Sequence, residues 1–128
     1  LWRAMGSPEP TGTACPFTDV KADACDYKAV LWAAEKGITS GTGAAAFSPD
    51  DACTRAQVVT FLWRAAGSPA APAANPFTDV ASGLYYTDAV LWAVSEKITE
   101  GTAAAAFSPA RDCTRAQIVA FLWRQLGK

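Results

Sequence analysis

Apolar residues recur at helical spacing in two stretches of the chain, one beginning near Asp26 and the other near Thr87. Those that share this spacing are Val30, Leu31 and Ala34 in the first stretch, and Val90, Leu91, Val94 and Ile98 in the second. Steps of three and four residues place side chains on one face of an α-helix. We therefore predict one helix in each stretch, packed through its apolar face.

A second pair of helices is predicted to start at the sequence Thr-Arg-Ala-Gln, which occurs at residues 54–57 and 114–117. It fits a capping box, in which the Thr hydroxyl accepts from the third helical N–H and the Gln side chain reaches back to the cap. The apolar residues that follow cover much of the helix circumference, as expected of a helix packed between neighbours. They are Val58, Val59, Phe61, Leu62 and Trp63, and Ile118, Val119, Phe121, Leu122 and Trp123.

In each half of the chain, the loop that leads from the first predicted helix to the second holds a Gly-Thr turn, an Ala-rich stretch and the sequence Phe-Ser-Pro. We expect Phe47 and Phe107 to plug the core, with at most short strand pairing in the loop. Gly37 stands where a left-handed residue would end the first helix, whereas its counterpart Lys97 would incur a steric cost at positive φ. The two helix ends are therefore expected to differ in shape.

All of these elements occur twice, about 60 residues apart, which indicates an internal repeat. Pro-Phe-Thr-Asp-Val, for example, occurs at residues 16–20 and again at 76–80. Residues 1–8 match residues 62–69, so the chain reads as an excised piece of a longer array with a further copy upstream. A Pro/Ala segment favours an extended spacer between the copies. The predicted organisation is a repeat tail with linker at 1–14, a repeat at 15–67, a linker at 68–75 and a repeat at 76–128.

The composition excludes several classes of protein. With 128 residues, 51% of them apolar, the chain can bury a core and is not intrinsically disordered. A formal charge of −1 lacks the basic excess that neutralises nucleic acid. No apolar run approaches the roughly 20 residues that span a bilayer, so we expect neither a nucleic-acid partner nor membrane insertion.

Catalysis is also not expected. The chain contains no histidine, the residue most used for acid–base work near neutral pH and a common metal ligand. The acidic pair Asp50 and Asp51 becomes Ala110 and Arg111 in the second copy. We therefore predict that the protein is not an enzyme and uses no cofactor.

The order of the motifs resembles the S-layer homology (SLH) repeat of bacterial surface proteins. The resemblance covers both copies and the tail, and rests on the Phe-x-Asp-Val opening, the Ala-Val helix, the Gly turn, the Phe-x-Pro loop and Thr-Arg-Ala-Gln. The chain departs from the family pattern at four positions: Gln57, Gln117, Cys25 and Lys97 stand where the family usually has Glu, Glu, an aromatic residue and Gly.

The resemblance implies a mainly α fold of helix-loop-helix repeats around a central helical bundle, a pseudo-threefold array whose first repeat is truncated here. It also implies a secreted protein held on the cell wall or S-layer surface of a Gram-positive-type bacterium. Family members bind secondary cell-wall polysaccharide without a covalent bond, in grooves between adjacent repeats. In some members that glycan carries a pyruvate ketal.

Arg55 and Arg115 are the first candidate ligand-binding residues. Each stands at the first helical position, where the macrodipole makes a cation mildly unfavourable, so helix stability does not explain them. A guanidinium offers a planar fork to a carboxylate, and the family places its ligand-contacting arginine here. The alternative is a structural salt bridge to Asp19 or Asp79.

Turn residues form the second group of candidates. Asp19 and Asp79 follow Phe-Thr in a turn, where a carboxylate accepts either backbone N–H groups or, in a binding site, a sugar hydroxyl. The Gly-Thr turns could bring backbone N–H groups close to a ligand. Their residues are Gly41, Thr42, Gly101 and Thr102.

Aromatic residues complete the set. Tyr85, beside Tyr86, holds the family's aromatic position, where it could stack on a sugar ring or pack against the protein. The tryptophans within the helical patterns are assigned to the core and left out of the site. These are Trp32, Trp63, Trp92 and Trp123.

The four cysteines fall into two groups. Cys15 and Cys25 occur in one copy only, across the Phe-Thr-Asp-Val turn, and we predict a disulfide between them in an extracellular setting. Cys53 and Cys113 hold equivalent positions before the capping threonines and are expected to be buried free thiols. A zinc site is not expected without Cys-x-x-Cys spacing or histidine.

The leading hypothesis is a non-catalytic module that anchors a secreted protein by binding an anionic secondary cell-wall polysaccharide between repeats, with a pyruvylated glycan as one form that the resemblance implies. The alternative is a structural assembly module that binds no glycan. In that case the open face of the bundle would associate with another chain, as in a homo-oligomer.

Overall fold

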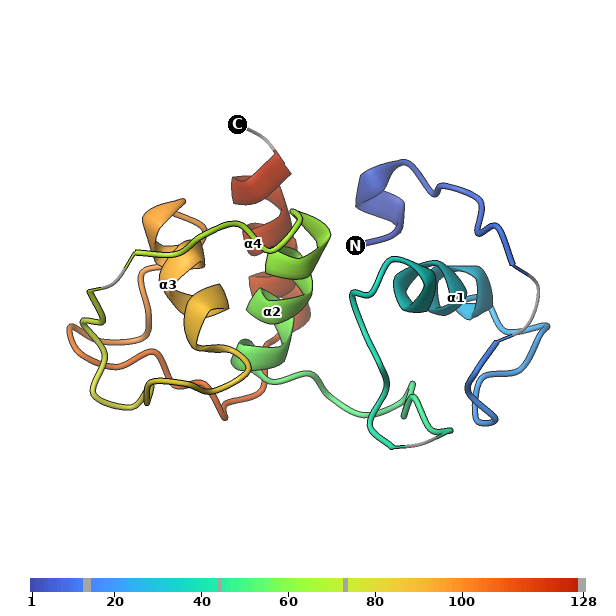
Figure 1. The fold of residues 1–128 in the computed structure, drawn as a ribbon, viewed down its shortest axis with the longest axis horizontal. Coiled ribbons are helices and arrows are strands. Elements are labelled where there is room, and N and C mark those ends of the chain that lie inside the picture. Colours follow the sequence, from blue (N-terminus) through green and yellow to red (C-terminus); the bar gives the residue numbers. More distant parts are fainter. Residues whose placement is uncertain (13–14, 44, 73, 127–128) are drawn as a thin grey trace. The chain divides into compact units, whose positions relative to one another are not determined.

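The computed structural model describes residues 1–12, 15–43, 45–72 and 74–126, with the side chain of Arg115 excepted. Its elements are a short 3₁₀ helix, η1 (Arg3–Met5), and the helices α1 (Tyr27–Glu35), α2 (Arg55–Ala65), α3 (Thr87–Ser95) and α4 (Arg115–Leu126) (Figure 1). Within the described ranges, strand pairing is limited to isolated bridges, Thr54 with Asp112 and Ala103 with Ala106. The prediction of a mainly α fold with at most short strand pairing is confirmed. None of the described helices is long and apolar enough to cross a membrane.

Helices α2 and α4 begin at the predicted capping boxes. At α2, Gln57 N donates to Thr54 Oγ1 (3.2 Å) and Thr54 N donates to Gln57 Oε1 (2.9 Å). At α4, Gln117 N donates to Thr114 Oγ1 (3.1 Å) and Thr114 N donates to Gln117 Oε1 (2.9 Å). Each box satisfies two N–H groups that a helix start would otherwise leave unpaired. A short local sequence therefore determines where both helices begin.

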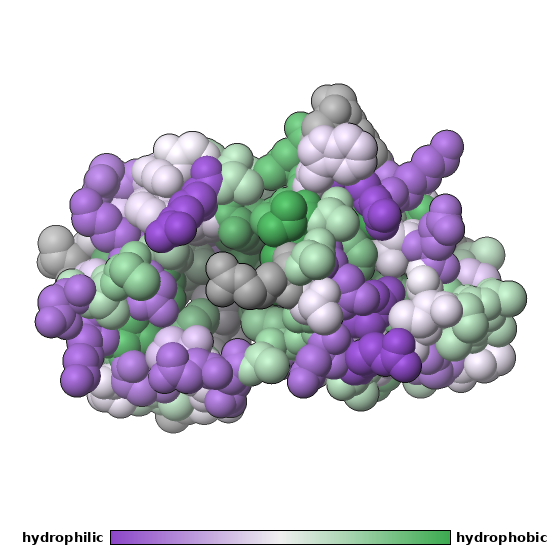
Figure 2. Space-filling model, turned by 180° about the vertical axis from the view of Figure 1, so that it is seen from behind, coloured by the Kyte–Doolittle hydropathy of each residue, from purple (hydrophilic) through white to green (hydrophobic). Residues whose placement is uncertain are grey.

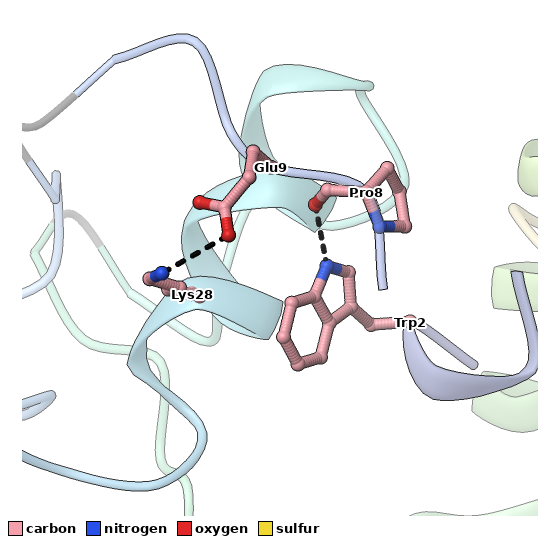
Figure 3. Close-up of polar contacts among 4 residues, drawn as sticks. All are labelled: Trp2, Pro8, Glu9 and Lys28. Carbon is pink, nitrogen blue, oxygen red and sulfur yellow. Dashed lines mark hydrogen bonds and ion pairs between the residues drawn. The ribbon is translucent and has the colours of Figure 1, made fainter. Parts of the chain in front are cut away.

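A tryptophan closes the turn that follows α2. The indole of Trp63 donates to the Pro69 carbonyl (2.8 Å), and Gly67 takes the left-handed conformation (φ 91°) that ends the helix. Near the start of the chain, the indole of Trp2 donates to the Pro8 carbonyl in the same way (2.7 Å; Figure 3). The matching sequences at residues 1–8 and 62–69 thus form the same contact.

The chain divides into two compact units, residues 1–51 and residues 52–128. The first unit holds η1 and α1, and the second holds α2, α3 and α4. Helix α2, which follows α1 in the first sequence copy, packs against α3 of the second copy. The first unit therefore joins the repeat tail to the first part of one sequence copy, and the second unit joins the rest of that copy to the whole of the next one.

The core of the first unit is a small apolar cluster. Phe17, Val20 and Val30 are buried, and Phe47 packs against them, with 5.3 Å between the Phe17 and Phe47 ring centroids. On the surface, Lys28 Nζ lies 3.1 Å from Glu9 Oε1 (Figure 3). Both side chains of this ion pair are exposed, so it contributes little stability.

The core of the second unit is more complete. Its fully enclosed residues come from α2, α3 and the loops that follow α3, and each has an exposed fraction of 0%: Val59, Ala89, Val90, Ala93, Ile98 and Phe107. The Phe77 and Phe107 ring centroids lie 5.6 Å apart. The prediction that Phe107 and Phe47 plug the core is confirmed, with Phe107 the more deeply enclosed.

The ends of α1 and α3 have the same shape, so the expectation that they differ is wrong. Lys97 takes a left-handed φ of 61°, close to the 72° of Gly37. The following residues, Ile38 and Ile98, each donate to the carbonyl five residues upstream (2.9 Å in both) and are buried. Burial of this isoleucine requires the turn, and Lys97 adopts it despite its Cβ.

The assignment of all four helical tryptophans to the core is wrong for Trp123. Trp32 and Trp92 are buried and Trp63 is half-buried, but 73% of Trp123 is exposed. Val119 and Leu126, also on α4, are exposed as well. No described residue covers this face of α4. Figure 2 shows green, apolar side chains exposed near the middle of this view of the surface.

Candidate functional site

A pocket of about 420 Å³ opens in the second unit, between the start of α2, the turn after α3 and one face of α4. We refer to it as the cationic pocket, because three of its residues carry positive charge and one carries negative charge. The residues that line it are Arg55, Lys97, Thr99, Glu100, Gly101, Gln117, Ala120, Phe121 and Arg124. The arrangement favours an anionic ligand.

Arg55, the first residue of α2, is the buried cation of the pocket, with an exposed fraction of 3%. Its Nε donates to the Phe107 carbonyl (2.9 Å), and its Nη2 donates to Thr99 Oγ1 (3.3 Å). The guanidinium carbon lies 4.7 Å from the centroid of the Phe107 ring and 5.6 Å from that of Phe121. A guanidinium has five N–H donors, so these two bonds leave donors for a further acceptor.

The charge of Arg55 has no contacting anion within the described part of the chain. Among the described side chains, Arg55 forms no salt bridge to Asp19 or Asp79. The same alternative for Arg115 stays a prediction, because its side chain lies outside the described residues. Burial lowers the pKa of Arg55, and the field of nearby Asp79 opposes that shift. Arginine nevertheless stays protonated at neutral pH. A carboxylate entering the pocket would supply the missing partner.

Two further cations stand at the edge of the pocket. Lys97 is exposed and holds its left-handed backbone conformation at a cost of about 1 kcal/mol, which a glycine would avoid. Arg124 Nη1 donates to the Ile98 carbonyl (3.0 Å), which fixes the arginine against the same turn. Strained residues of this kind tend to occur at functional sites. Glu100 is the acidic residue of the lining.

Asp19 and Asp79 use both carboxylate oxygens on the backbone of their own loops. Asp79 Oδ1 and Oδ2 accept from the N–H groups of Phe107 (2.9 Å) and Ser108 (2.8 Å). Asp19 accepts in the same way from Phe47 (2.9 Å) and Ser48 (2.8 Å). These backbone bonds lower the pKa of each aspartate below its usual range. In the structure, both aspartates thus accept from backbone N–H groups, the first of the two roles considered from the sequence. Neither residue lines the cationic pocket.

Gly101 belongs to the pocket for a steric reason. A Cβ there would lie 2.8 Å from Phe77 Cε1, and φ is 93°, so only glycine fits. Its N–H already donates to Thr99 Oγ1 (3.2 Å), as that of Gly41 does to Thr39 Oγ1 (3.1 Å). These N–H groups are therefore engaged within the protein rather than presented to a ligand.

The other predicted residues of the turns lie outside the pocket. The hydroxyls of Thr42 and Thr102 pair with those of Ser48 (2.6 Å) and Ser108 (2.5 Å). Both threonines are exposed, but neither belongs to the pocket lining. Their role in the structure is to hold the Gly-Thr turn against the Phe-Ser-Pro loop.

Tyr85 and Arg115 are the remaining predicted site residues, and their roles in binding stay predictions. Tyr85 is 57% exposed and meets Tyr86 edge to face, with 5.0 Å between ring centroids, outside the cationic pocket. Partial burial raises the pKa of Tyr85, Tyr86 adds to that shift, and Arg64 opposes it. Arg115 is the first residue of α4, and its side chain lies outside the described residues.

All four cysteines are free thiols in this structure. Cys15 packs against the core of the first unit, and Cys25 is exposed at a separate pocket of the same unit; the disulfide between them stays a prediction. Cys113 is buried, as predicted, and Cys53 is half-buried. Among the described side chains, no group of His, Cys, Asp and Glu could hold a metal ion.

Sequence reasoning missed most of the pocket lining. Lys97 was noted only for its backbone, and Gln117 only for its capping bond. Thr99, Phe121 and Arg124 carried no motif of their own, because the three segments that supply the lining are far apart in sequence. The available signal was Lys97 itself, a residue with a Cβ where the first copy has Gly37.

Comparison with known protein families and sequences agrees with this architecture. The family model of the S-layer homology domain matches residues 16–59 and again residues 76–119. The chain belongs to the S-layer homology domain family, a cell-wall anchoring module of bacterial cell-surface proteins.

Three relatives illustrate the context of such modules. A cell surface protein of Thermoanaerobacter kivui is 33% identical over 117 residues, which is 88% of this chain and 15% of that protein. An endoglucanase of a Bacillus species is 32% identical over 116 residues (91% and 12%). The middle cell wall protein of Brevibacillus brevis is 30% identical over 128 residues (97% and 12%). The chain therefore spans less than a sixth of the length of each of these relatives. Its family and the cell-surface and cell-wall proteins among its relatives assign it to the bacterial cell surface.

Proposed function

We propose that this module holds its parent protein on the cell wall by binding an anionic secondary cell-wall polysaccharide in the cationic pocket, without catalysis. The observation that carries the proposal is the buried guanidinium of Arg55, which keeps free N–H donors and has no contacting carboxylate among the described residues. A carboxylate on the glycan, such as a pyruvate ketal, would match that fork. Lys97 and Arg124 would hold further acidic or hydroxyl groups.

The pocket also has the composition and size for a sugar. Its volume of about 420 Å³ is within the usual range for small-ligand sites. Phe121 supplies an apolar wall, and Thr99, Glu100 and Gln117 supply hydrogen-bonding groups. Because α2 comes from the first sequence copy and α4 from the second, a site here lies between adjacent repeats, as the family resemblance implies.

In the parent protein, we expect a third repeat to complete a pseudo-threefold array around the second helices. The tail at residues 1–8, which forms the same Trp–Pro contact as residues 62–69, supports this arrangement. Several pockets acting together would raise the affinity of the array well above that of one pocket.

The test is a sedimentation assay on purified Gram-positive cell walls, before and after removal of the secondary polysaccharide. We expect the 128-residue protein to bind intact walls and to lose most binding after removal. Arg55→Lys, which keeps the charge but not the fork, should weaken binding about tenfold or more, and Lys97→Ala with Arg124→Ala should do the same. Equal binding by all proteins, or equal binding to stripped walls, would contradict the proposal.

Lys21→Ala is the matched control. Lys21 is exposed, lies outside the cationic pocket, and has Ala81 as its counterpart in the second copy. The substitution removes the same charge as Lys97→Ala, so it corrects for general electrostatic attraction to an anionic wall. Circular dichroism should show unchanged helix content in every variant compared.

The second candidate function is assembly through α4 without glycan binding. It is favoured by the exposed stripe of Val119, Trp123 and Leu126, which are 64%, 73% and 42% exposed and recur at helical spacing. A partner helix from another repeat or another copy would cover this stripe. Trp123→Gln should then reduce self-association in analytical ultracentrifugation while wall binding stays unchanged; if wall binding falls with assembly, the two functions are coupled.

A further inference from the structure

Two cysteines face each other across the segments that lead into α2 and α4. Thr54 and Asp112 form an antiparallel bridge, and beside it Cys113 N donates to the Cys53 carbonyl (2.8 Å). On the other side of the bridge, Arg55 N donates to the Arg111 carbonyl (2.8 Å). This pattern places Cys53 directly opposite Cys113.

The geometry of such a pair suits a disulfide. Directly opposite residues of an antiparallel pair point to the same face, with Cα atoms about 5.5 Å apart in a hydrogen-bonded pair. Disulfides join residues whose Cα atoms lie about 4.4–6.8 Å apart. Burial raises the pKa of Cys113, the charge of Arg55 opposes that shift, and the Cys53 thiol adds to it.

We propose that Cys53 and Cys113 form an intramolecular disulfide that ties the start of α2 to the start of α4. The two residues are equivalent in the two sequence copies, so the bond would link successive repeats. The bond would hold Arg55, on α2, and Gln117, on α4, on opposite sides of the cationic pocket.

The bond forms by exchange with an external disulfide, for which glutathione disulfide serves as the probe. Half-buried Cys53 is the more accessible thiol. Its thiolate attacks one sulfur of glutathione disulfide and releases one glutathione thiolate, leaving a mixed disulfide. The Cys113 thiolate then attacks the Cys53 sulfur and releases the second glutathione. The cysteine pair loses two protons and two electrons, and glutathione disulfide gains them as two thiols.

The two thiols react slowly at neutral pH, because burial raises the pKa of both. The rate of exchange should therefore increase as the pH rises toward the ordinary thiol range. The loop closed by the bond contains the whole of α2 and α3. Closure of a loop of this length restricts the unfolded chain, so the oxidised protein should melt at a higher temperature.

Peptide mapping identifies the bond without ambiguity. Trypsin places the four cysteines in four separate peptides: residues 4–21, 22–28, 37–55 and 112–115. The native protein is incubated with oxidised and reduced glutathione at pH 8, alkylated and digested. We expect a cross-linked pair of peptides 37–55 and 112–115, which disappears on reduction, and a rise in melting temperature of the intact protein.

The Cys15→Ala/Cys25→Ala variant keeps only the proposed pair and should form the same bond, while Cys113→Ser should abolish it. A parallel reaction in guanidinium chloride removes the fold, and the native protein should form the bond faster than the unfolded one. The proposal would be overturned if both thiols stay free in the native protein, if Cys53 pairs with Cys15 or Cys25, or if the bond links two molecules. Wall binding tests the proposed function separately, because the reduced protein keeps the pocket.

Discussion

The Phe-Ser-Pro loop of the first unit and that of the second unit have the same internal bonds and different surroundings. In both, an aspartate accepts from two loop N–H groups, at 2.9 and 2.8 Å in each unit. In the second unit, however, Phe107 is fully enclosed and its carbonyl accepts from Arg55, whereas Phe47 is only half-buried. Thr99 likewise is buried under Arg55, while its counterpart Thr39 remains half-buried.

This difference distinguishes the contacts that form within one repeat from those that need the neighbouring repeat. The loop, its aspartate and its Gly-Thr turn form in both units, because their bonds join residues of the same copy. The cationic pocket forms where the start of α2 and one face of α4 meet the turn after α3. A binding site of this kind is therefore a property of adjacent repeats.

The largest expected effect distinguishes the two phenylalanines. Phe107→Ala should destabilise the second unit by about 3–5 kcal/mol, because it removes a fully enclosed ring and leaves a cavity. Phe47→Ala should cost clearly less, because the ring is half-buried. Urea unfolding curves of the two variants measure both values, and equal losses would show that the two loops are covered alike.

Acid should weaken both loops together. Backbone hydrogen bonds hold the pKa values of Asp19 and Asp79 below that of an unfolded aspartate, about 3.9. The stability they contribute is fully present above that value and is lost as the pH falls through the lower, folded pKa values. Asp79→Asn should therefore reduce the loss of stability between about pH 4 and pH 2. Thermal melts over this pH range check it, and an unchanged pH profile would contradict the role of the backbone bonds.

Lys97→Gly gives the end of α3 the same residue as the end of α1 and should affect stability and binding in opposite directions. The backbone strain disappears, which should stabilise the second unit by about 1 kcal/mol. The pocket loses a cation, so wall binding should weaken. Calorimetry and the sedimentation assay measure the two effects on the same protein. A variant that is both more stable and equally well bound would remove Lys97 from the site.

The smallest expected effect isolates the bond from Arg55 to Thr99. Thr99→Val and Thr39→Val each remove the acceptor of a glycine N–H, but only Thr99→Val also removes an acceptor of Arg55. The difference between the two losses of stability should be about 0.5–1 kcal/mol, the usual net value of one hydrogen bond. Equal losses in urea unfolding would indicate that Arg55 gains nothing from Thr99.

Much of the fold could be predicted from the sequence, because its signals are local. The capping boxes at Thr54 and Thr114, the core position of Phe107 and the helix starts follow from residues a few positions apart. The exposed Trp123 could not be predicted, since an apolar pattern shows which face of a helix can be buried but not whether a neighbour covers it. The shape of the turn at Lys97 was also missed, because burial of Ile98 outweighed the local preference for glycine.

Of the candidate site, the sequence identified Arg55 and Gly101 but not the residues around them. Arg55 was singled out because a cation at a helix start is locally unfavourable. That reasoning identifies a single residue and does not show which other residues lie around it. Lys97, Phe121 and Arg124 are joined to it only by packing of distant segments. The position of Asp79 outside the pocket likewise depends on its bonds to the N–H groups of Phe107 and Ser108.

The sequence by itself determined the repeat, the helices and their caps, because hydrogen bonds and apolar periodicity within a few residues specify them. Only the tertiary structure decided that Arg55 is buried with no contacting carboxylate among the described residues, and that Cys53 lies opposite Cys113. The same holds for the exposure of Trp123 on α4, which no residue of the described ranges covers. Each of these depends on how segments from different copies pack, and contacts over such separations leave no periodic signal in the chain.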